Sequence, residues 1–390
     1  MKIAIVGIGY VGLSLGVLLS RNHEVVMIDT NRNKVNSINQ GQSPIEEEMI
    51  KKELKKSRYK LSATWFSEDA YKHSEFIIVC VPTDWIDGNL KSSIVEEVIK
   101  NILGVNKMAT IVIKSTVPIG YTENLRKKFK YSDIIFSPEF LREGFAIQDN
   151  IHPSRIIVSN ESVRYKVFVE LLLEIVGDKN VPVLVTSSSE AEAVKLFSNS
   201  FLALKIAYFN ELDTFAELKN LSTEKIIEGV CYDWRIGNSH NNPSFGFGGY
   251  CLPKDSKQLS YHFQGIPATL IKNICRSNYL RKLHIVQEVI NRVKEKNIKI
   301  VGIYRVNSKL NSDNLRGSSI ISIIEELHKY GVTVFVYEPL VEAESFKNCK
   351  ILTDLLEFKK ISQLILANRI DEGLAGSMEK IYTRDVFNKD

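Results

Sequence analysis

Short apolar runs alternate with helical patterns along the first half of the chain. The runs are KIAIVGI, HEVVMID, FIIVCVP, TIVIKST and DIIFSP, and turn residues bound each of them. Alternation of this kind predicts a parallel sheet that is covered by helices on both faces. Two later runs, RIIVS and VPVLVTS, are expected to extend the same sheet to about residue 187.

The next stretch, residues 187–222, has a helical pattern and contains neither glycine nor proline. It predicts one long helix, which begins with a capping box formed by Ser189 and Glu192. A helix of this length between two α/β parts can also supply a surface for a dimer, although the pattern alone does not demonstrate one.

Strand and helix patterns resume from about residue 296, in IKIVGIYRV, SIISIIEELHKYG, TVFVYEP and ISQLILANRI. They predict a second, smaller parallel sheet. The fold class is therefore α/β, with two Rossmann-like parallel-sheet domains joined by a long central helix. We place the domains at residues 1–188, 189–294 and 295–390, which suits the usual size of a domain.

The composition narrows the class of protein. Hydrophobic residues make up 44% of the 390 residues and charged residues 25%, which argues against a disordered chain. A formal charge of +5 without a long basic block gives little support to nucleic-acid binding and suits a small anionic ligand. The sequence contains no uninterrupted apolar run of ~20 residues, so we do not expect a membrane span.

The cysteines show no pattern of a disulfide framework or a metal site. There are five, at positions 80, 231, 251, 275 and 349, with no CxxC pair and no Cys/His spacing typical of zinc. We therefore expect reduced thiols, a cytoplasmic location and no metal.

A glycine-rich motif follows the first predicted strand. Gly7, Gly9 and Gly12 form GxGxxG between KIAIV and a helical pattern, which is the context of a dinucleotide site. The first glycine permits a tight turn, the second lets the backbone approach a pyrophosphate, and the third lets helix and strand pack closely. The beginning of the helix then offers unpaired N–H groups to the phosphates.

Asp29 ends the second predicted strand, at the usual distance from the glycines for a carboxylate that binds an adenosine ribose. An acid at this position repels a 2′-phosphate, so it favours NAD over NADP. Arg32 and Lys34 lie nearby and moderate that preference.

Four further segments are rich in polar residues. They are Lys114–Pro118, Ser137–Gly144, the helix positions Lys205 and Asn210, and FGFGGYCLPKD at 245–255. Each has a structural alternative: a strand cap, a solvated turn, a lysine that extends from an apolar helix to solvent, or a small buried cysteine. Taken singly, the segments leave structural and functional readings open.

Taken together, the motifs carry a resemblance. The chain contains GxGxxG with Asp29, KSTVP, SPEFLREG, NSFLALKIAYFNE, DWRIG, FGFGGYCLPKD and SDNLRGSS in an order and spacing that resemble the nucleotide-sugar 6-dehydrogenases, the UDP-glucose/GDP-mannose dehydrogenase family. The resemblance covers nearly the whole chain. It implies an N-terminal NAD-binding domain, a central helical domain for dimerisation that carries a catalytic cysteine, and a C-terminal UDP-sugar domain. We accordingly expect a homodimer.

The reaction that the resemblance implies is a four-electron oxidation of UDP-glucose to UDP-glucuronate with two NAD, in the supply of polysaccharide precursors. The Cys251 thiolate is expected to form a thiohemiacetal and then a thioester. Lys205, in a desolvated cleft, is one candidate for the first base, and a water held by Thr116, Glu139 and Asp255 is the other. Lys205 and Asn210 are expected to stabilise the oxyanion, and Asp255 and Glu139 to position the hydrolytic water.

The same resemblance supplies the remaining binding residues. For NAD they are Gly7, Gly9, Tyr10, Val11, Gly12, Asp29, Lys34, Thr83, Thr116, Glu143, Lys254 and Arg316. For the UDP-sugar they are Glu139, Phe140, Leu141, Arg142, Lys205, Asn210, Arg235, Phe245, Gly246, Phe247, Gly248, Gly249 and Lys309. Lys254 is additionally expected to favour the thiolate of Cys251 if it lies close to it.

Three alternatives stay open at this point. The same residues serve a dehydrogenase of UDP-N-acetylmannosamine or GDP-mannose equally well. A non-catalytic nucleotide-binding protein would be expected to have lost the cysteine, the lysine or the carboxylates, and none of them is lost. A simple 3-hydroxyacid dehydrogenase would need neither the glycine-flanked cysteine nor the third domain.

Overall fold

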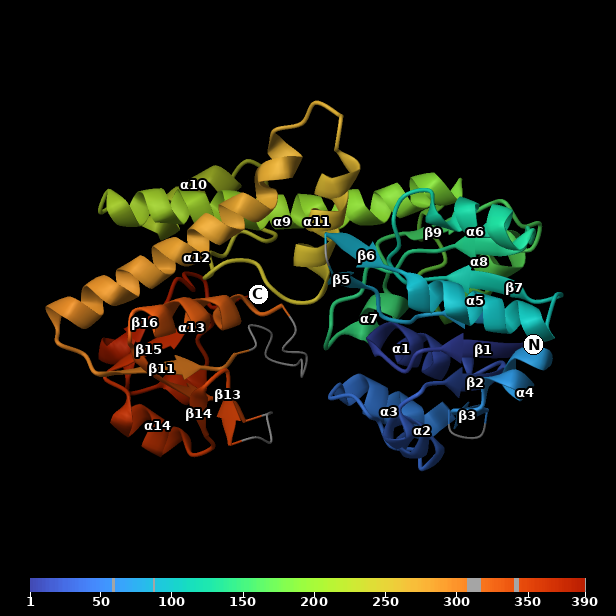
Figure 1. Cartoon of the computed structure of the whole chain (residues 1–390), viewed down its shortest axis with the longest axis horizontal. Coiled ribbons are helices and arrows are strands. Elements are labelled where there is room, and N and C mark those ends of the chain that lie inside the picture. Colours follow the sequence, from blue (N-terminus) through green and yellow to red (C-terminus); the bar gives the residue numbers. More distant parts are fainter. Residues whose placement is uncertain (58–59, 87, 307–316, 340–343, 390) are drawn as a thin grey trace. The chain divides into compact units, whose positions relative to one another are not determined.

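The computed structural model describes residues 1–57, 60–86, 88–306, 317–339 and 344–389. They form two compact units, Met1–Phe197 (unit 1) and Ser198–Asp390 (unit 2). The boundary lies within the long helix α9 (Ser188–Leu218), so this helix contributes side chains to both units (Figure 1).

A six-stranded parallel sheet forms the centre of unit 1, in the order β3-β2-β1-β4-β7-β8. Its strands are β1 (Lys2–Val6), β2 (Glu24–Ile28), β3 (Leu61–Thr64), β4 (Phe76–Val79), β7 (Thr110–Ile113) and β8 (Ile134–Phe136). The strand order reverses between β1 and β4. In open α/β sheets, ligands bind beyond the carboxyl ends of the strands at such a switch point.

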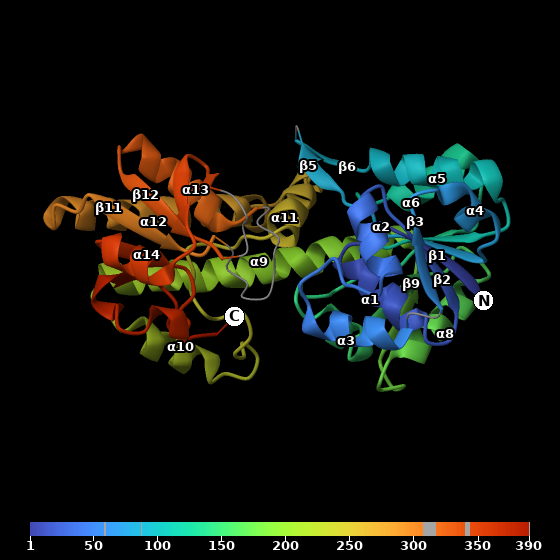
Figure 2. The same ribbon diagram turned by 90° about the horizontal axis from the view of Figure 1, so that it is seen from below.

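Successive residues of β1 point to opposite faces of the sheet, as expected for a strand. Ile3 and Ile5 join one buried cluster, and Ala4 and Val6 join the other. The first cluster packs on α1 (Tyr10–Leu19), α2 (Arg32–Asn39), α3 (Glu48–Ser57), α7 (Ala146–Ile151) and α8 (Tyr165–Ile175). The second packs on α4 (Ser67–Lys72), α5 (Ser93–Val105) and α6 (Tyr121–Phe129), and Figure 2 shows the sheet between these two layers.

Two smaller sheets complete unit 1. An antiparallel pair joins β5 (Asp84–Ile86) to β6 (Asn89–Lys91), and a parallel pair joins β9 (Ile156–Ser159) to β10 (Val183–Thr186). The expectation that the last two strands extend the main sheet is therefore wrong. The backbone N–H of Phe136 in β8 donates to the hydroxyl of Ser159 in β9 at 2.9 Å. A side-chain hydrogen bond thus takes the place of backbone pairing between these two strands.

The first turn of α9 also differs from the prediction. The capping box consists of Ser187 and Glu190, since the N–H of Ser187 donates to the Glu190 carboxylate at 3.0 Å and the N–H of Glu190 donates to the Ser187 hydroxyl at 3.3 Å. The predicted box of Ser189 and Glu192 is wrong, because the Glu192 carboxylate accepts hydrogen bonds from outside α9.

Unit 2 contains the second sheet, in the order β13-β14-β12-β11-β15-β16. All neighbours are parallel except β13 and β14. Its strands are β11 (Ile300–Tyr304), β12 (Thr333–Tyr337), β13 (Ser345–Phe346), β14 (Cys349–Leu352), β15 (Leu364–Ala367) and β16 (Ile381–Tyr382). The predicted α/β class, with two parallel sheets and a long helix, is confirmed.

Helices cover both faces of this sheet too. They are α12 (Leu270–Glu295) and α13 (Ser319–Lys329) on one face, and α14 (Leu355–Ile361) on the other. Gly302 in β11 permits the close approach of α14, since a Cβ there would lie 2.7 Å from the Phe358 ring. The remaining helices are α10 (Thr223–Cys231), α11 (Cys251–His262) and the 3₁₀ turns η1 (Glu372–Leu374) and η2 (Met378–Lys380).

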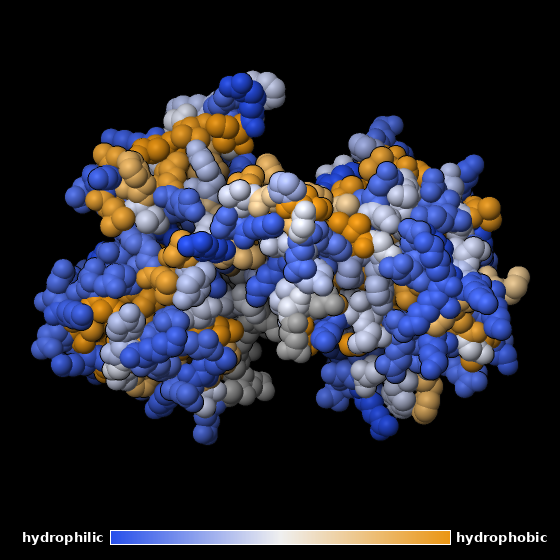
Figure 3. Space-filling model, turned by 45° about the horizontal axis from the view of Figure 1, so that its top comes forward, coloured by the Kyte–Doolittle hydropathy of each residue, from blue (hydrophilic) through white to orange (hydrophobic). Residues whose placement is uncertain are grey.

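The surface of unit 2 carries exposed aromatic side chains on α9. Phe201, Tyr208 and Phe215 are 63%, 57% and 56% exposed, and they recur every seven residues, so they lie along one face of the helix. On the face shown in Figure 3, hydrophobic side chains of unit 2 reach the surface among hydrophilic ones. Among the described residues, no helix is long and apolar enough to span a bilayer.

Candidate active site

The glycine motif forms a tight connection between β1 and α1. Gly7 has a φ of +104°, and a Cβ there would lie 2.5 Å from the Cys80 carbonyl oxygen, so only glycine fits. A Cβ on Gly12 would collide with the Gly7 carbonyl, whereas one on Gly9 would meet no atom within 4 Å. Gly9 therefore leaves open space at the beginning of α1, where Tyr10 and Val11 form the first turn.

This geometry fits the diphosphate of a dinucleotide. The first turn of α1 contains no acidic residue and its N-cap has no side-chain hydrogen bond, so no carboxylate offsets the positive end of the helix dipole, which favours an anion. The absence of a Cβ at Gly9 permits close approach.

Asp29 lies at the end of β2 beside this turn. Its carboxylate accepts hydrogen bonds from the N–H groups of Ile8 and Asn31, both at 2.8 Å. The Lys34 ammonium donates to the Ile8 carbonyl at 2.9 Å. The predicted ribose carboxylate and its neighbouring cation thus adjoin the glycine turn.

The segments after β4, β7 and β8 are joined by hydrogen bonds. The Thr83 hydroxyl donates to the Thr116 carbonyl at 2.7 Å, and the Ser115 hydroxyl donates to the Val81 carbonyl at 2.7 Å. The Lys114 ammonium donates to the Ser137 carbonyl at 3.1 Å. KSTVP and SPEFLREG therefore lie together at the carboxyl edge of the sheet.

Burial changes the acidity of two groups in this cluster. It lowers the pKa of Lys114 to about 8, because a charged ammonium is poorly solvated there. It raises the pKa of the neighbouring Cys80 thiol to about 12. Cys80 is therefore a neutral thiol at physiological pH.

Glu139 forms a buried ion pair with Lys195 of α9. The Lys195 ammonium lies 2.8 Å from the carboxylate and also donates to the Glu139 backbone carbonyl at 2.5 Å. The Leu141 N–H donates to the same carboxylate at 2.8 Å. Burial alone would raise the pKa of Glu139, but Lys195 and these hydrogen bonds hold it below its usual value.

The rest of SPEFLREG is exposed or partly buried. Arg142 is exposed and pairs with Asp149 at 2.7 Å, and the Arg155 guanidinium lies over the Phe140 ring at 3.8 Å. Leu141 and Glu143 are partly buried. Their predicted roles toward NAD and the sugar stay predictions.

In unit 2, Cys251 is the first residue of α11 and is half-buried. Asp255 lies one turn further along, fully buried, with Lys254 at 2.7 Å from one carboxylate oxygen and the amide of Asn199 at 2.5 Å from the other. All five cysteines are among the described residues, and none is in a disulfide.

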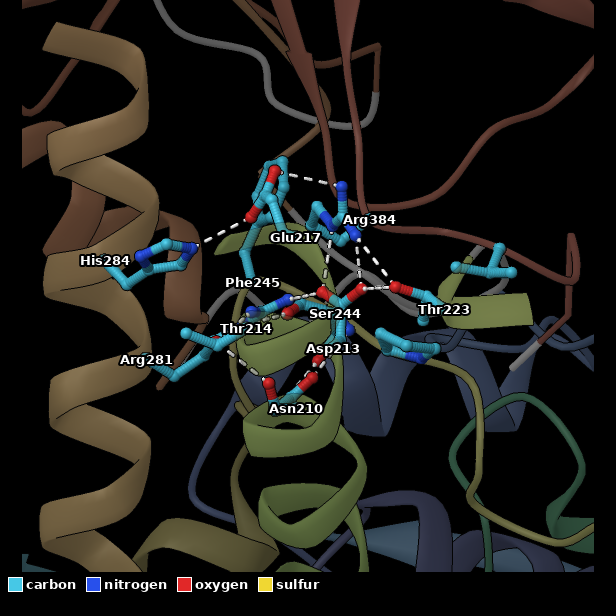
Figure 4. Close-up of polar contacts among 12 residues, drawn as sticks. Asn210, Asp213, Thr214, Glu217, Thr223, Ser244, Phe245, Arg281, His284 and Arg384 are labelled. Carbon is cyan, nitrogen blue, oxygen red and sulfur yellow. Dashed lines mark hydrogen bonds and ion pairs between the residues drawn. The ribbon is translucent and has the colours of Figure 1, made fainter. Parts of the chain in front are cut away.

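Lys205 and Asn210 form hydrogen bonds with groups other than these carboxylates. The partly buried Lys205 ammonium donates to the Ile236 carbonyl at 2.8 Å and the Ser239 hydroxyl at 3.1 Å. Asn210 is buried and bonds Ser244, where its side-chain oxygen accepts from the backbone N–H (Figure 4). Their roles in oxyanion stabilisation stay predictions.

The other residues predicted to bind the sugar differ in burial, and one of them lies outside the described residues. Arg235 is exposed and pairs with Asp233 at 2.5 Å. Phe245 and Phe247 are buried, and Gly248 and Gly249 connect them to the residues before Cys251. Lys309 and Arg316 lie outside the described residues.

Three segments of the chain match the three domains of one family. Residues 1–175 match the NAD binding domain of the UDP-glucose/GDP-mannose dehydrogenase family, residues 189–279 its central domain and residues 302–386 its UDP binding domain. The chain belongs to this family. It is thus an NAD-binding dehydrogenase, as the sequence predicted.

Members of the UDP-glucose/GDP-mannose dehydrogenase family align along the full chain. It is 46% identical over 398 residues to the UDP-glucose 6-dehydrogenase of Streptococcus pneumoniae, which covers 100% of both proteins. The UDP-glucose 6-dehydrogenase of Campylobacter jejuni is also 46% identical, over 397 residues and 100% of both.

A solved structure, a UDP-glucose dehydrogenase from Pyrobaculum islandicum, superimposes with a TM-score of 0.87. It covers 98% of this chain and 94% of its own, at 24% identity. At this identity the likeness shows the shared fold. The division into domains at 188 and 294 stays a prediction.

Two residues beside the acidic groups escaped the sequence-based assignment as catalytic candidates. Lys195 contacts Glu139 and Asn199 contacts Asp255, and the two lie four positions apart on α9. That i, i+4 spacing in KLFSN was a usable signal, because it places both polar groups on one face of the helix. Lys205 and Asn210 lack this spacing.

Proposed function

We propose that the chain oxidises UDP-glucose to UDP-glucuronate in two NAD-dependent steps. The observation that carries the proposal is the 46% full-length identity to two UDP-glucose 6-dehydrogenases, together with a cysteine at the beginning of α11. NAD, when bound, accepts a hydride from the sugar carbon in each step. Water supplies the second carboxylate oxygen, and the two oxidations and the hydrolysis together release three protons.

The ionised Glu139 is the proposed acceptor of the first hydroxyl proton, through a water that it orients with Thr116. Its lowered pKa keeps the carboxylate ionised, so the carboxylate can accept a hydrogen bond from that water. We assign the adjacent cation to Lys195 instead of Lys205, since Lys195 is the lysine that contacts Glu139.

Cys251 is the proposed nucleophile for the second oxidation. Its thiolate adds to the aldehyde carbon, the resulting thiohemiacetal loses a hydride and becomes a thioester, and water releases the carboxylate and the thiol. The beginning of a helix favours a thiolate. Asp255, one turn along α11 and fixed by Asn199 and Lys254, is the proposed carboxylate that orients the hydrolytic water.

Stoichiometry and substrate choice test the proposal. Purified protein is expected to form two NADH per UDP-glucose, and Cys251→Ala is expected to lose UDP-glucuronate production while retaining NAD binding. Wild-type turnover by Cys251→Ala, or one NADH per sugar, contradicts the covalent scheme. A higher kcat/KM for UDP-N-acetylmannosamine or GDP-mannose than for UDP-glucose overturns the substrate assignment and leaves the chemistry standing.

We further propose a homodimer that works in the cytoplasm. The aromatic face of α9 supports the dimer, because exposed aromatic side chains at a seven-residue repeat are typical of helix pairing. Five thiols outside disulfides fit a reducing compartment. Cell fractionation with an activity assay tests the location.

A further inference from the structure

The backbone that leads to Cys251 is held by buried asparagine side chains. Residues 244–247 form no helix or strand, so their N–H groups need partners other than a regular ladder. Three asparagine oxygens accept from three of these N–H groups: Asn210 from Ser244 at 2.8 Å, Asn368 from Phe245 at 2.7 Å, and Asn278 from Phe247 at 2.8 Å. We name these three asparagines the asparagine clamp.

The clamp gathers residues that are distant in sequence. Asn210 lies on α9, Asn278 on α12, and Asn368 directly after β15. All three are buried, at 1%, 6% and 3% exposure. In such a setting a lost partner leaves a buried N–H unsatisfied, so each amide contributes more than a surface hydrogen bond does.

Asn278 makes two hydrogen bonds to the backbone of Phe247. Its oxygen accepts from the Phe247 N–H and its Nδ2 donates to the Phe247 carbonyl, both at 2.8 Å. Gly246 has a φ of +122°, and a Cβ there would lie 2.8 Å from the Asn278 oxygen. The glycine of the cysteine segment and the asparagine of α12 therefore fit only as a pair.

A buried group of ions fixes the clamp helices against each other. Arg281 of α12 donates to the Ser244 carbonyl at 2.9 Å and to Asp213 of α9 at 2.5 Å. Arg384, near the end of the chain, also pairs with Asp213, as Figure 4 shows. The two helices that carry Asn210 and Asn278 thus share one carboxylate.

We propose that the asparagine clamp positions the cysteine segment for catalysis, so that Asn210, Asn278 and Asn368 are positioning residues for Cys251. The segment continues from Phe247 to Gly249, whose N–H donates to the Gly317 carbonyl at 3.1 Å, and α11 begins two residues later. Asn210 then serves the backbone at Ser244 in place of the oxyanion role expected from the sequence. The inference rests on the proposed function for the task of Cys251.

Asn278→Ala and Asn368→Ala test the clamp, with Asn273→Ala as the matched control. Asn273 is exposed on the same helix as Asn278 and bonds a carbonyl of its own helix end. We expect the clamp variants to exchange the amide hydrogens of residues 244–247 faster. The rate of Cys251 alkylation by iodoacetamide, followed on its own peptide by mass spectrometry, is expected to change about threefold or more, because the thiol is no longer fixed.

Kinetics separate positioning from general stability. We expect kcat with UDP-glucose to fall about a hundredfold, since a small displacement of a reacting group has that effect. The KM for NAD is expected to stay within about twofold of wild type, since the glycine turn and Asp29 lie in unit 1. Folded variants with unchanged alkylation and kcat overturn the proposal, even if amide exchange rises.

Two further outcomes also test the proposed positioning role: a variant that does not fold, and wild-type protein that does not oxidise UDP-glucose. If one alanine variant fails to fold, the other one and Asn278→Ser carry the test, and failure of all of them makes the clamp a folding element, which overturns the positioning role. If wild-type protein does not oxidise UDP-glucose, the proposed function fails. The rate of Cys251 alkylation and the amide exchange of residues 244–247 still test the clamp, because neither measurement requires a substrate.

Discussion

The buried carboxylate of Glu139 depends on the ammonium of Lys195 for its charge. Their side chains are 11% and 3% exposed, so neither ion is well solvated by water. Because the folded-state pKa of Glu139 lies below its usual value, its ionised form adds stability above the unfolded pKa, near 4.5. That contribution is lost as the pH falls through the folded pKa.

Lys195→Met is expected to reverse this shift. Without the cation, burial dominates and raises the pKa of Glu139, so the acidic limb of the kcat profile moves to higher pH by about one pH unit or more. Loss of the partner also leaves a buried charge and lowers the free energy of unfolding by about 3–5 kcal/mol. Rate measurements from pH 5 to 9 and denaturant unfolding provide the check.

The double variant Lys195→Met/Glu139→Gln serves as the control for this pair. It removes both charges, so we expect it to be more stable than Lys195→Met alone. An acidic limb that stays at its wild-type pH in Lys195→Met would show that Glu139 is not the titrating group.

At the scale of elements, Glu192 joins α9 to the beginning of α6. Its buried carboxylate accepts from the N–H groups of Gly120 at 2.6 Å and Thr122 at 2.9 Å, directly after KSTVP. Burial raises the pKa of Glu192 to about 7, although these hydrogen bonds oppose the shift. The link between the two helices therefore changes charge near neutral pH.

We expect Glu192 to lower stability as the pH rises. A raised folded pKa means that the folded protein binds more protons than the unfolded chain between about pH 4.5 and 7, so stability falls across that window and stays lower above it. Glu192→Gln cannot ionise, so its melting temperature is expected to fall less between pH 5 and 8 than that of wild type. Parallel curves for the two proteins, recorded by calorimetry, would contradict the assignment.

At the scale of the whole molecule, the exposed face of α9 governs the proposed assembly. We expect Phe201→Ser/Phe215→Ser to shift the protein from dimer to monomer, because two large apolar groups leave the proposed contact. Leu356→Ser, which is 77% exposed on α14, is the matched control and is expected to keep the dimer. Light scattering coupled to gel filtration measures both, and a dimer that persists in the double variant would place the interface elsewhere.

The sequence determined the two sheets, the long helix, the glycine turn and the family. Apolar periodicity reports which residues are buried, and GxGxxG and FGFGGYCLPKD are short local motifs whose backbone demands are visible in the residue types. That is why Asp29 adjoins the turn as expected. The roles of the site residues in catalysis stay predictions.

The tertiary structure decided which polar groups meet. Lys195 reaches a glutamate 56 positions away, and Asn199 an aspartate also 56 positions away, while Lys205 and Asn210 bond the backbone at Ile236 and Ser244. The helical period gives the direction of a side chain on its own helix but does not name the group that packs opposite. For the same physical reason, the separate pair of β9 and β10 and the asparagine clamp emerge only when segments distant in sequence are brought into contact.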